Sequence, residues 1–297
     1  MNNFFRATLA AVTIAALGGA AACSKADSAP PVATVSFEAN RTRVAQGSPV
    51  DLTYRFVVAP GAPLTGNYRV FVHVKNADGQ LIWGDDHDPA IPTSQWKPGQ
   101  TIEYTRTKFV PVYPYVGEAT VWLGLHRDND RLPLQGPDAA DRDQPEREYK
   151  VGTLTIMTGA ENIFVIKKNG WYPAEYDDAN LGGGSQWTQK VAVFDFPNPR
   201  KNVAFYLEYD ARPDMFPGQP QQVTIYAGDQ LLKTFPADNQ GMSIRLIEIP
   251  AAALGGGEMA EIRIELDKTF VPAKMPSGGT DTRELGIRVY HAYVETR

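Results

Sequence analysis

The feature that most constrains this chain is an alternation of apolar and polar residues that recurs along most of its length. Successive side chains of a β-strand point to opposite faces, so a period of two indicates a strand with one buried face. No stretch of comparable length shows the 3.6-residue period of an amphipathic helix. The sequence therefore predicts an all-β protein. The clearest runs are Val50 to Val58, Tyr68 to Val74, Ala119 to Leu125, Val203 to Tyr209 and Ile262 to Leu266.

Length and turn signals divide the strands into two tandem sandwiches. A chain of 297 residues is long enough for two domains of ordinary size. About seven short strands over residues 33–158 predict an immunoglobulin-like or fibronectin-like sandwich, with Asn76–Gly79 as a hairpin turn. A polar segment, Pro133–Glu148, is expected to be an exposed loop before the last strand of this domain. Roughly eight strands over residues 160–297 predict a jelly-roll-like sandwich.

The N-terminus predicts a secretion signal. Leu9–Leu17 is an apolar run well short of the roughly 20 residues that a membrane-spanning helix needs. Ala20–Ala22 and Cys23, the only cysteine of the chain, resemble the lipobox of bacterial lipoproteins, with Ala20 where that family usually has leucine. The resemblance implies a signal peptide at residues 1–22, a lipidated Cys23 carrying acyl chains such as palmitate, and a tether at 23–32.

Two further expectations follow from this N-terminus. Cleavage by an ordinary signal peptidase after the alanines is the alternative, and it would release a soluble protein. Ser24, which follows the cysteine where aspartate would signal inner-membrane retention, implies sorting to the outer membrane. The two domains would then face the periplasm, and stable anchoring would come from more than one acyl chain.

Composition and the motifs that are lacking disfavour several classes of function. The formal net charge is −5 and neither sign forms a long run, which disfavours nucleic-acid binding and electrostatic docking on anionic lipid. If Cys23 carries lipid, no disulfide is possible. The sequence has none of the short metalloprotease, thiol-redox or serine-hydrolase motifs, and we expect no cofactor, no metal and no catalytic site.

Two sets of motifs resemble accessory modules of the bacterial envelope. The first set is similar to a β-sandwich module that often follows polytopic glycosyltransferases: Phe71–Val74, Asp78–Gly79, Asp86–His87, Pro92–Gly99, Gly124–Leu125 and Arg131–Leu134. The second is similar to a sandwich module of surface-polysaccharide glycosyltransferases: Gly170–Glu175, Trp187–Thr188, Phe270–Ala273 and Asp281–Val289. Gln186 stands where the second module has arginine. Since no nucleotide-sugar fold precedes these segments, the resemblance implies association with glycan machinery and not transfer activity.

Aromatic and charged residues near strand ends predict a glycan site in the second domain. Tryptophan faces stack on sugar rings, and carboxylates or arginines bind the hydroxyl groups. The first and last strands of a jelly roll often neighbour each other, which would bring the two ends of the domain to one rim. In the alternative interpretation the tryptophans are core residues and the charges form a structural ion pair. The candidate ligand-binding residues are Trp171, Glu175, Trp187, Arg283 and Glu284.

The first domain offers a second, weaker candidate at Asp85–Asp88. Clustered carboxylates can bind calcium, and a carboxylate beside His87 can act in acid–base chemistry. An ordinary turn with side-chain-to-backbone hydrogen bonds explains the same residues more simply. A metal site of His73, His87 and His126 would need all three on adjacent strands, and surface histidines are the simpler interpretation.

Taken together, these observations favour a non-enzymatic envelope lipoprotein that binds glycans or assists surface polysaccharide assembly. The alternative is a structural adaptor that docks another envelope protein, and a hydrolase acting through Asp85–Asp88 is a third class. An exposed aromatic groove would favour the first, a broad apolar patch the second, and carboxylates with raised pKa in a cleft the third.

Overall fold

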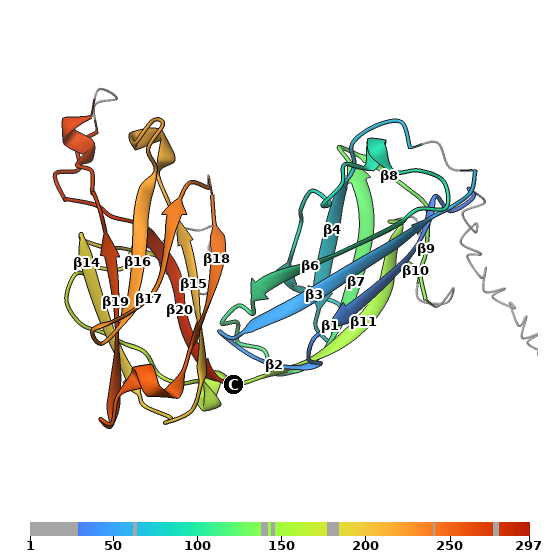
Figure 1. The fold of residues 1–297 in the computed structure, drawn as a ribbon. Coiled ribbons are helices and arrows are strands. Elements are labelled where there is room, and N and C mark those ends of the chain that lie inside the picture. Colours follow the sequence, from blue (N-terminus) through green and yellow to red (C-terminus); the bar gives the residue numbers. More distant parts are fainter. Residues whose placement is uncertain are drawn as a thin grey trace, which may run out of the picture.

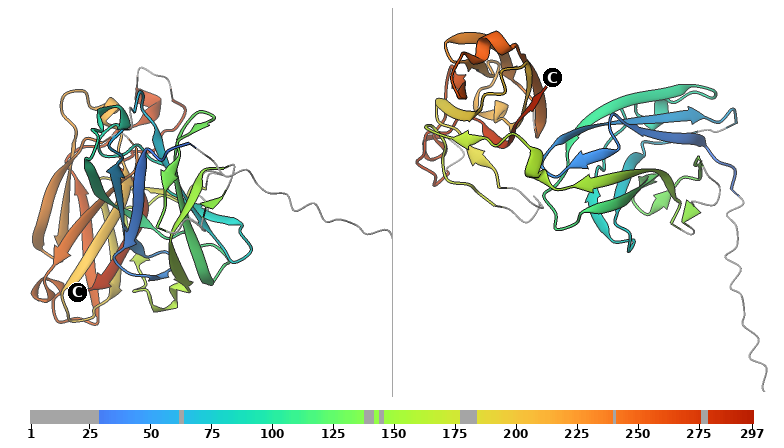
Figure 2. Two further views of the ribbon diagram at one scale, coloured as in Figure 1. Left: turned by 90° about the vertical axis from the view of Figure 1, so that its right-hand side faces the viewer. Right: turned by 90° about the horizontal axis from the view of Figure 1, so that it is seen from below.

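The chain folds into four β-sheets arranged as two sandwiches set side by side (Figures 1 and 2). The computed structural model describes residues 29–61, 64–137, 142–143, 146–176, 184–239, 241–275 and 279–297. Within these ranges there is no α-helix, which confirms the all-β prediction. Cys23, the expected signal peptide and most of the tether lie outside the described residues. None of the described helices is both long enough and apolar enough to span a bilayer.

The first sandwich has the strand order of an immunoglobulin-like fold. β1, β3 and β6 take the places of strands A, B and E, while β11, β7, β4 and β5 take those of G, F, C and C′. One sheet consists of β6 (Thr101–Phe109), β3 (Pro49–Val58), β1 (Ala33–Ala39) and β9 (Leu134–Gln135). The other consists of β10 (Arg142–Asp143), β11 (Glu148–Met157), β7 (Gly117–Arg127), β4 (Arg69–Lys75) and β5 (Leu81–Gly84), with β2 (Arg43–Ala45) on β11 and β8 (Asp130–Arg131) on β7.

The structure confirms the predicted turn of this sandwich but not the whole of the predicted loop. Asn76–Gly79 forms the β4–β5 hairpin, where Gly79 has a φ of 77° that favours glycine. The segment expected to be an exposed loop instead begins with a strand. Leu134 is buried and pairs in parallel with Ala33 of β1, because its side chain completes the core at the edge of that sheet.

The second sandwich is a jelly roll. When β13 to β20 are numbered one to eight, the two sheets have the orders 1-8-3-6 and 2-7-4-5. One sheet consists of β13 (Gln186–Trp187), β20 (Arg288–Thr296), β15 (Val203–Asp210) and β18 (Ser243–Ile249). The other consists of β12 (Ile166–Lys167), β14 (Val191–Pro197), β19 (Met259–Leu266), β16 (Gln221–Ala227) and β17 (Gln230–Ala237). Short 3₁₀ turns are η1 (Thr93–Gln95), η2 (Gly159–Glu161), η3 (Pro213–Met215), η4 (Ala251–Leu254) and η5 (Pro272–Lys274).

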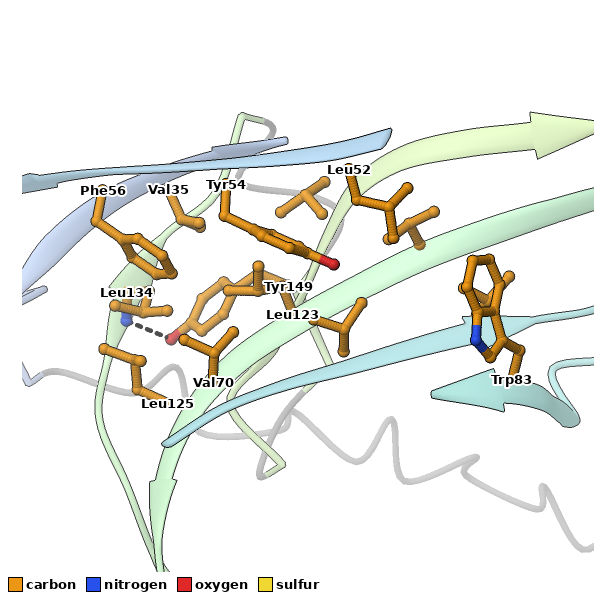
Figure 3. Close-up of a cluster of buried hydrophobic side chains, with 14 of the residues drawn as sticks. Val35, Leu52, Tyr54, Phe56, Val70, Trp83, Leu123, Leu125, Leu134 and Tyr149 are labelled. Atoms are coloured by element: carbon orange, nitrogen blue, oxygen red, sulfur yellow. Dashed lines mark hydrogen bonds between the residues drawn. The ribbon is translucent and has the colours of Figure 1, made fainter. Parts of the chain in front are cut away.

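Each sandwich has its own hydrophobic core. In the first, the apolar faces of β1 and β3 meet those of β4, β7 and β11, as the period of two predicts (Figure 3). Tyr149 lies inside this core, and its hydroxyl oxygen accepts a 2.8 Å hydrogen bond from the backbone N–H of Leu134. In the second, Phe194 of β14 and Phe205 of β15 pack across the two sheets with ring centroids 5.2 Å apart.

A short, packed segment joins the sandwiches. The last strand of the first ends at Met157 and the first strand of the second begins at Ile166. Between them, the Asn162 side chain donates a 2.8 Å hydrogen bond to the carbonyl oxygen of Gln46. β20 lies at this junction with the C-terminus, so the last strand of the chain faces the first sandwich (Figure 1). At the same junction Phe109 stacks on His291 with centroids 4.3 Å apart.

Candidate functional site

The jelly-roll topology brings both ends of the second domain to one rim. The segment from Trp171 to Glu175 pairs with the segment from Ser185 to Thr188 through two isolated bridges, and β13 pairs with β20. The backbone N–H groups of Glu175 and Ser185 bond each other's carbonyl oxygens at 2.7 and 2.8 Å. The expectation that residues near 171 and near 283 share a rim is therefore met in the geometry.

A charged cluster occupies this rim, and we call Tyr172, Glu175, Asp281 and Arg283 the rim cluster. The Arg283 guanidinium donates to Glu175 Oε1 at 2.6 Å and to Asp281 Oδ2 at 2.7 Å, and it lies over the Tyr172 ring, 5.2 Å from its centroid. The hydrogen bonds from Arg283 lower the pKa of the Asp281 carboxyl, and those to Asp281 and Glu175 raise the pKa of Arg283. Asp281 and Arg283 are therefore both charged at neutral pH, and the arginine is held in one orientation.

Part of the hydrogen-bonding capacity of the cluster remains unused. Within the described residues, neither Nη1 of Arg283 nor Oε2 of Glu175 forms a hydrogen bond. The side chains of Arg283 and Glu175 are 33% and 41% exposed, so both reach solvent. A donor and an acceptor thus lie side by side at the surface, an arrangement that can bind two neighbouring hydroxyl groups.

The two candidate tryptophans do not present open ring faces. Trp187 is 8% exposed and packs edge-on against Phe270, beside Leu285. Trp171 is half-buried against the domain core, its Nε1–H donates to the carbonyl oxygen of Val193, and the Lys167 ammonium lies 4.9 Å from its ring centroid. For these two residues the geometry agrees with the alternative interpretation, in which the tryptophans are structural. Trp83 and Trp96 of the first sandwich are buried as well.

Glu284 and Gln186 form hydrogen bonds that position the backbone around the rim. The carbonyl oxygen of Glu284 accepts a 3.0 Å hydrogen bond from the Tyr172 hydroxyl, and its carboxylate accepts one from the Thr269 hydroxyl. Gln186, in the position where the similar module has arginine, donates to the carbonyl oxygen of Tyr172 at 2.8 Å. These contacts fix the position of Tyr172 and therefore of the arginine above it.

Tyr176 is the aromatic residue that the sequence reasoning missed. Its side chain is 81% exposed, and it follows Glu175 directly at the rim. Its ring lies close to Gly184, where an added Cβ would come within 2.9 Å of Cε1. The sequence carries no periodic signal for Tyr176, because this residue follows an isolated bridge and lies in no strand.

In the first sandwich Asp85 is the centre of a buried polar network. Its carboxylate, 2% exposed, accepts two 2.9 Å hydrogen bonds from Arg106 and one of 3.0 Å from the Tyr54 hydroxyl. Burial alone would raise the pKa of Asp85, but the hydrogen bonds from Arg106 and the nearby Lys108 charge lower it overall. The Nδ1–H of His87 donates to the carbonyl oxygen of Asp85, its Nε2 forms a hydrogen bond with the Tyr104 hydroxyl, and burial lowers the pKa of His87.

This environment does not suit Asp85 to general acid catalysis, which requires a raised pKa. The network also shows that the simple turn interpretation was incomplete, because the partners of Asp85 come from the opposite sheet. Among the described residues no three histidine, cysteine, aspartate or glutamate side chains come together as a metal site. His73 bonds Glu148 and not another histidine.

Comparison with known proteins identifies no family. No protein-family model matches the sequence, and no curated protein matches it. A family GH115 4-O-methyl-α-glucuronidase matches with a TM-score of 0.30 and 12% identity, covering 50% of this chain and 19% of that one. A catalytic domain with the CBM51-1 and CBM51-2 domains of Clostridium perfringens ZmpB matches with 0.27 and 10%, covering 92% and 32%.

A third similar structure is the collagen adhesin of S. aureus, with a TM-score of 0.20 and 7% identity, covering 90% of this chain and 96% of that one. The chain spans between about a fifth and a third of the length of the first structures it matches. The structural neighbours thus include carbohydrate-binding-module and glycosidase-associated β-domains, but likeness at this level carries no argument about function.

Proposed function

We propose that this chain is a non-enzymatic glycan-binding protein of the cell envelope, and that the rim cluster with Tyr176 is its binding site. The observation that supports this most directly is the fixed Glu175–Arg283 pair, whose side chains both reach solvent and which is followed directly in the chain by the exposed Tyr176. A sugar ring offers a C–H face and a belt of hydroxyl groups. Tyr176 would stack on the C–H face, while Arg283 Nη1 and Glu175 Oε2 bind hydroxyl groups.

Binding fits the rim better than catalysis does. The carboxylates of Glu175 and Asp281 are both held by Arg283. A hydrolase needs one carboxyl group kept protonated near neutral pH, and the pKa of Asp281 is lowered instead. The resemblance of residues 170–175 and 281–289 to modules of surface-polysaccharide glycosyltransferases supports the same proposal from the sequence side.

The proposal is tested by titrating the mature chain without its lipidated cysteine, residues 24–297, against an array of bacterial surface polysaccharides. Tyr176→Ala is expected to weaken binding roughly threefold to tenfold, which corresponds to the 0.5–1.5 kcal/mol of an aromatic contact. Leu231→Ala is the control, because Leu231 is 55% exposed beside the β16–β17 hairpin and belongs to neither the rim cluster nor the junction groove. Equal binding by both variants, or no glycan binding by the unmodified chain, would refute the proposal.

We also propose that Cys23 anchors the protein in the outer membrane with the sandwiches facing the periplasm. The support is the resemblance of residues 20–23 to a lipobox. Mass spectrometry of the N-terminal peptide is expected to show acyl chains on Cys23, and Cys23→Ser is expected to move the protein from the membrane fraction to the soluble one. An unacylated N-terminus in the unmodified protein would rule this out.

A docking adaptor remains a second candidate, because one groove at the junction is apolar. Val112 and Phe164, 56% and 71% exposed, line a cavity of about 320 Å³ together with Ile163 and Val165. Cross-linking in cells from a photoreactive residue at position 164 tests it. A specific envelope protein captured there, in the absence of any glycan binding by the purified chain, would favour the adaptor over the glycan-binding protein.

A further inference from the structure

A polar cleft lies between the two sandwiches, away from the rim. Its volume is ≈ 590 Å³, large enough for a sugar unit or two. One wall comes from the end of β5 and from Thr105 to Lys108 of β6, and the other from Glu208, Met242 and Ile244 of the second sandwich. Figure 1 shows β6 and β18 on the two sides of this space. Neither sandwich alone would form it.

The first wall is rigid and presents unused donors. Asp85 fixes Arg106 through two hydrogen bonds, which leaves Nη1 of Arg106 without a hydrogen bond to any described residue. Lys108 Nζ lies 3.6 Å from Asp85 Oδ1, beyond hydrogen-bonding distance, and has no other described partner. The side chains of Arg106 and Lys108 are 34% and 25% exposed, so a guanidinium and an ammonium group both reach the cleft.

The charges of this wall favour an anion beside Lys108. Arg106 binds the Asp85 carboxylate bidentately, and the Lys108 ammonium forms a longer ion pair with the same carboxylate, 3.6 Å away, so these three groups together keep one positive charge in excess. A partly desolvated ammonium next to a guanidinium edge is a common binding arrangement for a carboxylate. Asp85 itself does not serve as that carboxylate, because its two oxygens already accept hydrogen bonds from Arg106 and Tyr54.

The remaining surfaces of the cleft suit the rest of a sugar ring. Met242, 55% exposed, and Ile244 give the second wall an apolar surface that can contact a C–H face. Acceptors for hydroxyl groups are Asp86 Oδ2 and Glu208 Oε1, neither of which has a described partner. The other oxygens of these two side chains are held by the Val72 N–H and by His291.

We infer that the interdomain cleft is a second binding site, specific for an acidic sugar whose carboxylate pairs with Lys108 and Arg106. The site does not depend on glycan binding at the rim, since it shares no residue with the rim cluster. It gives the two sandwiches a joint function, because ligand contacts come from both.

The test is a calorimetric titration of the mature chain with trigalacturonate, using maltotriose and acetate as the neutral-sugar and simple-carboxylate probes. We expect trigalacturonate to bind more tightly than either, with an affinity that falls as salt is added. Lys108→Met is expected to reduce that affinity about tenfold or more, and Lys108→Arg to retain most of it. Lys233→Met, at an exposed lysine on the edge strand β17, is the matched control.

Two further variants separate this inference from the proposed function. Ile244→Trp should block the cleft without altering its charges, and Tyr176→Ala should leave trigalacturonate binding unchanged. Thermal melts establish that each variant is folded. Binding that survives both Lys108→Met and Ile244→Trp would overturn the cleft site, and loss with Tyr176→Ala alone would assign the acidic sugar to the rim. If acetate binds as tightly as trigalacturonate, the cleft is a site for simple anions and not for a sugar. If maltotriose binds as tightly as trigalacturonate, the cleft has no preference for acidic sugars.

Discussion

At the scale of single residues, the sequence was the poorest guide to side chains that form several polar contacts, because it did not indicate their partners. Asp85 was expected to lie in a turn, and its sequence neighbours suggested local hydrogen bonds. Its main partners are instead Tyr54 and Arg106, on strands of the opposite sheet. Alternation predicts which face a residue occupies, but it does not predict which residue of another sheet lies opposite. For the same reason the sequence could not tell buried Trp187 from exposed Tyr176.

The Asp85 network predicts a specific pH dependence of stability. The pKa of Asp85 in the folded protein lies below its ordinary value of 3.8, so the ionised carboxylate stabilises the first sandwich. This contribution is fully present above pH 3.8 and is lost as the pH falls through the lower folded-state value. Asp85→Asn should cost about 2–3 kcal/mol at pH 7, less than the roughly 3–5 kcal/mol of a fully buried pair, because Arg106 reaches solvent.

Urea unfolding between pH 7 and pH 2 measures this effect. The free energies of unfolding of the unmodified chain and of Asp85→Asn should differ at neutral pH and converge as the solution becomes more acidic. Glu148, whose pKa is also lowered overall by the hydrogen bonds of His73 and Lys75 despite its burial, is intact in both proteins and cancels in the difference. A difference in the free energy of unfolding that stays constant over the whole pH range would contradict the assignment of this stabilisation to the ionised Asp85.

At the scale of strands, periodicity and turn chemistry predicted most of the architecture. The predicted Asn76–Gly79 turn lies between β4 and β5, as Gly79 with a φ of 77° allows. The irregular pairings around the rim were less predictable, because segments such as Trp171–Glu175 form isolated bridges and have no long alternating run. The rim is built where regular strand structure ends, so the residues that shape it carry little periodic signal.

Gly170 is the backbone position on which this irregular segment depends. Its φ is +80°, and a Cβ there would overlap the carbonyl oxygen of Val191 on β14. Its own carbonyl oxygen accepts a 2.8 Å hydrogen bond from the N–H of Gln189. Gly170→Ala is therefore expected to push the Trp171–Glu175 segment away from β14 and to cost about 1–3 kcal/mol of stability.

The displacement would be observed at the rim itself. Glycan affinity at the rim should fall in Gly170→Ala, and hydrogen exchange should rise for the N–H of Tyr172 and of Glu175, which bond Trp187 and Ser185. Gly228→Ala is the control, because Gly228 also has positive φ but its Cβ would meet open space. Similar exchange at the rim in both variants would show that Gly170 does not position this segment.

At the scale of the whole molecule, the two sandwiches keep separate cores yet share a packed junction. The apolar part of the junction centres on Phe109, which lies against Tyr206 and Tyr293 of the second sandwich and stacks on His291 at an interplanar angle of 7°. An ion pair between Arg41 and Glu295, 3.2 Å apart, lies beside it. The sequence predicted two domains but no contact between them, because Phe109, on the face of β6 opposite the core residues Ile102 and Tyr104, does not reveal which residues pack against it.

This junction predicts that a single substitution will uncouple the sandwiches without unfolding either. Phe109→Ala removes the ring between β6 and β20 and should cost about 2–4 kcal/mol, toward the lower part of the range for a buried aromatic residue. Because each sandwich has its own core, the expected result in calorimetry is two transitions in place of one. X-ray scattering should show a larger radius of gyration, and trigalacturonate binding in the cleft should weaken because its two walls separate.

Leu231→Ala is the control, because Leu231 is 55% exposed on the edge strand β17, and it should change none of these quantities. An unchanged radius of gyration in Phe109→Ala would mean that Arg41–Glu295 and the Asn162 segment hold the junction without the aromatic stack.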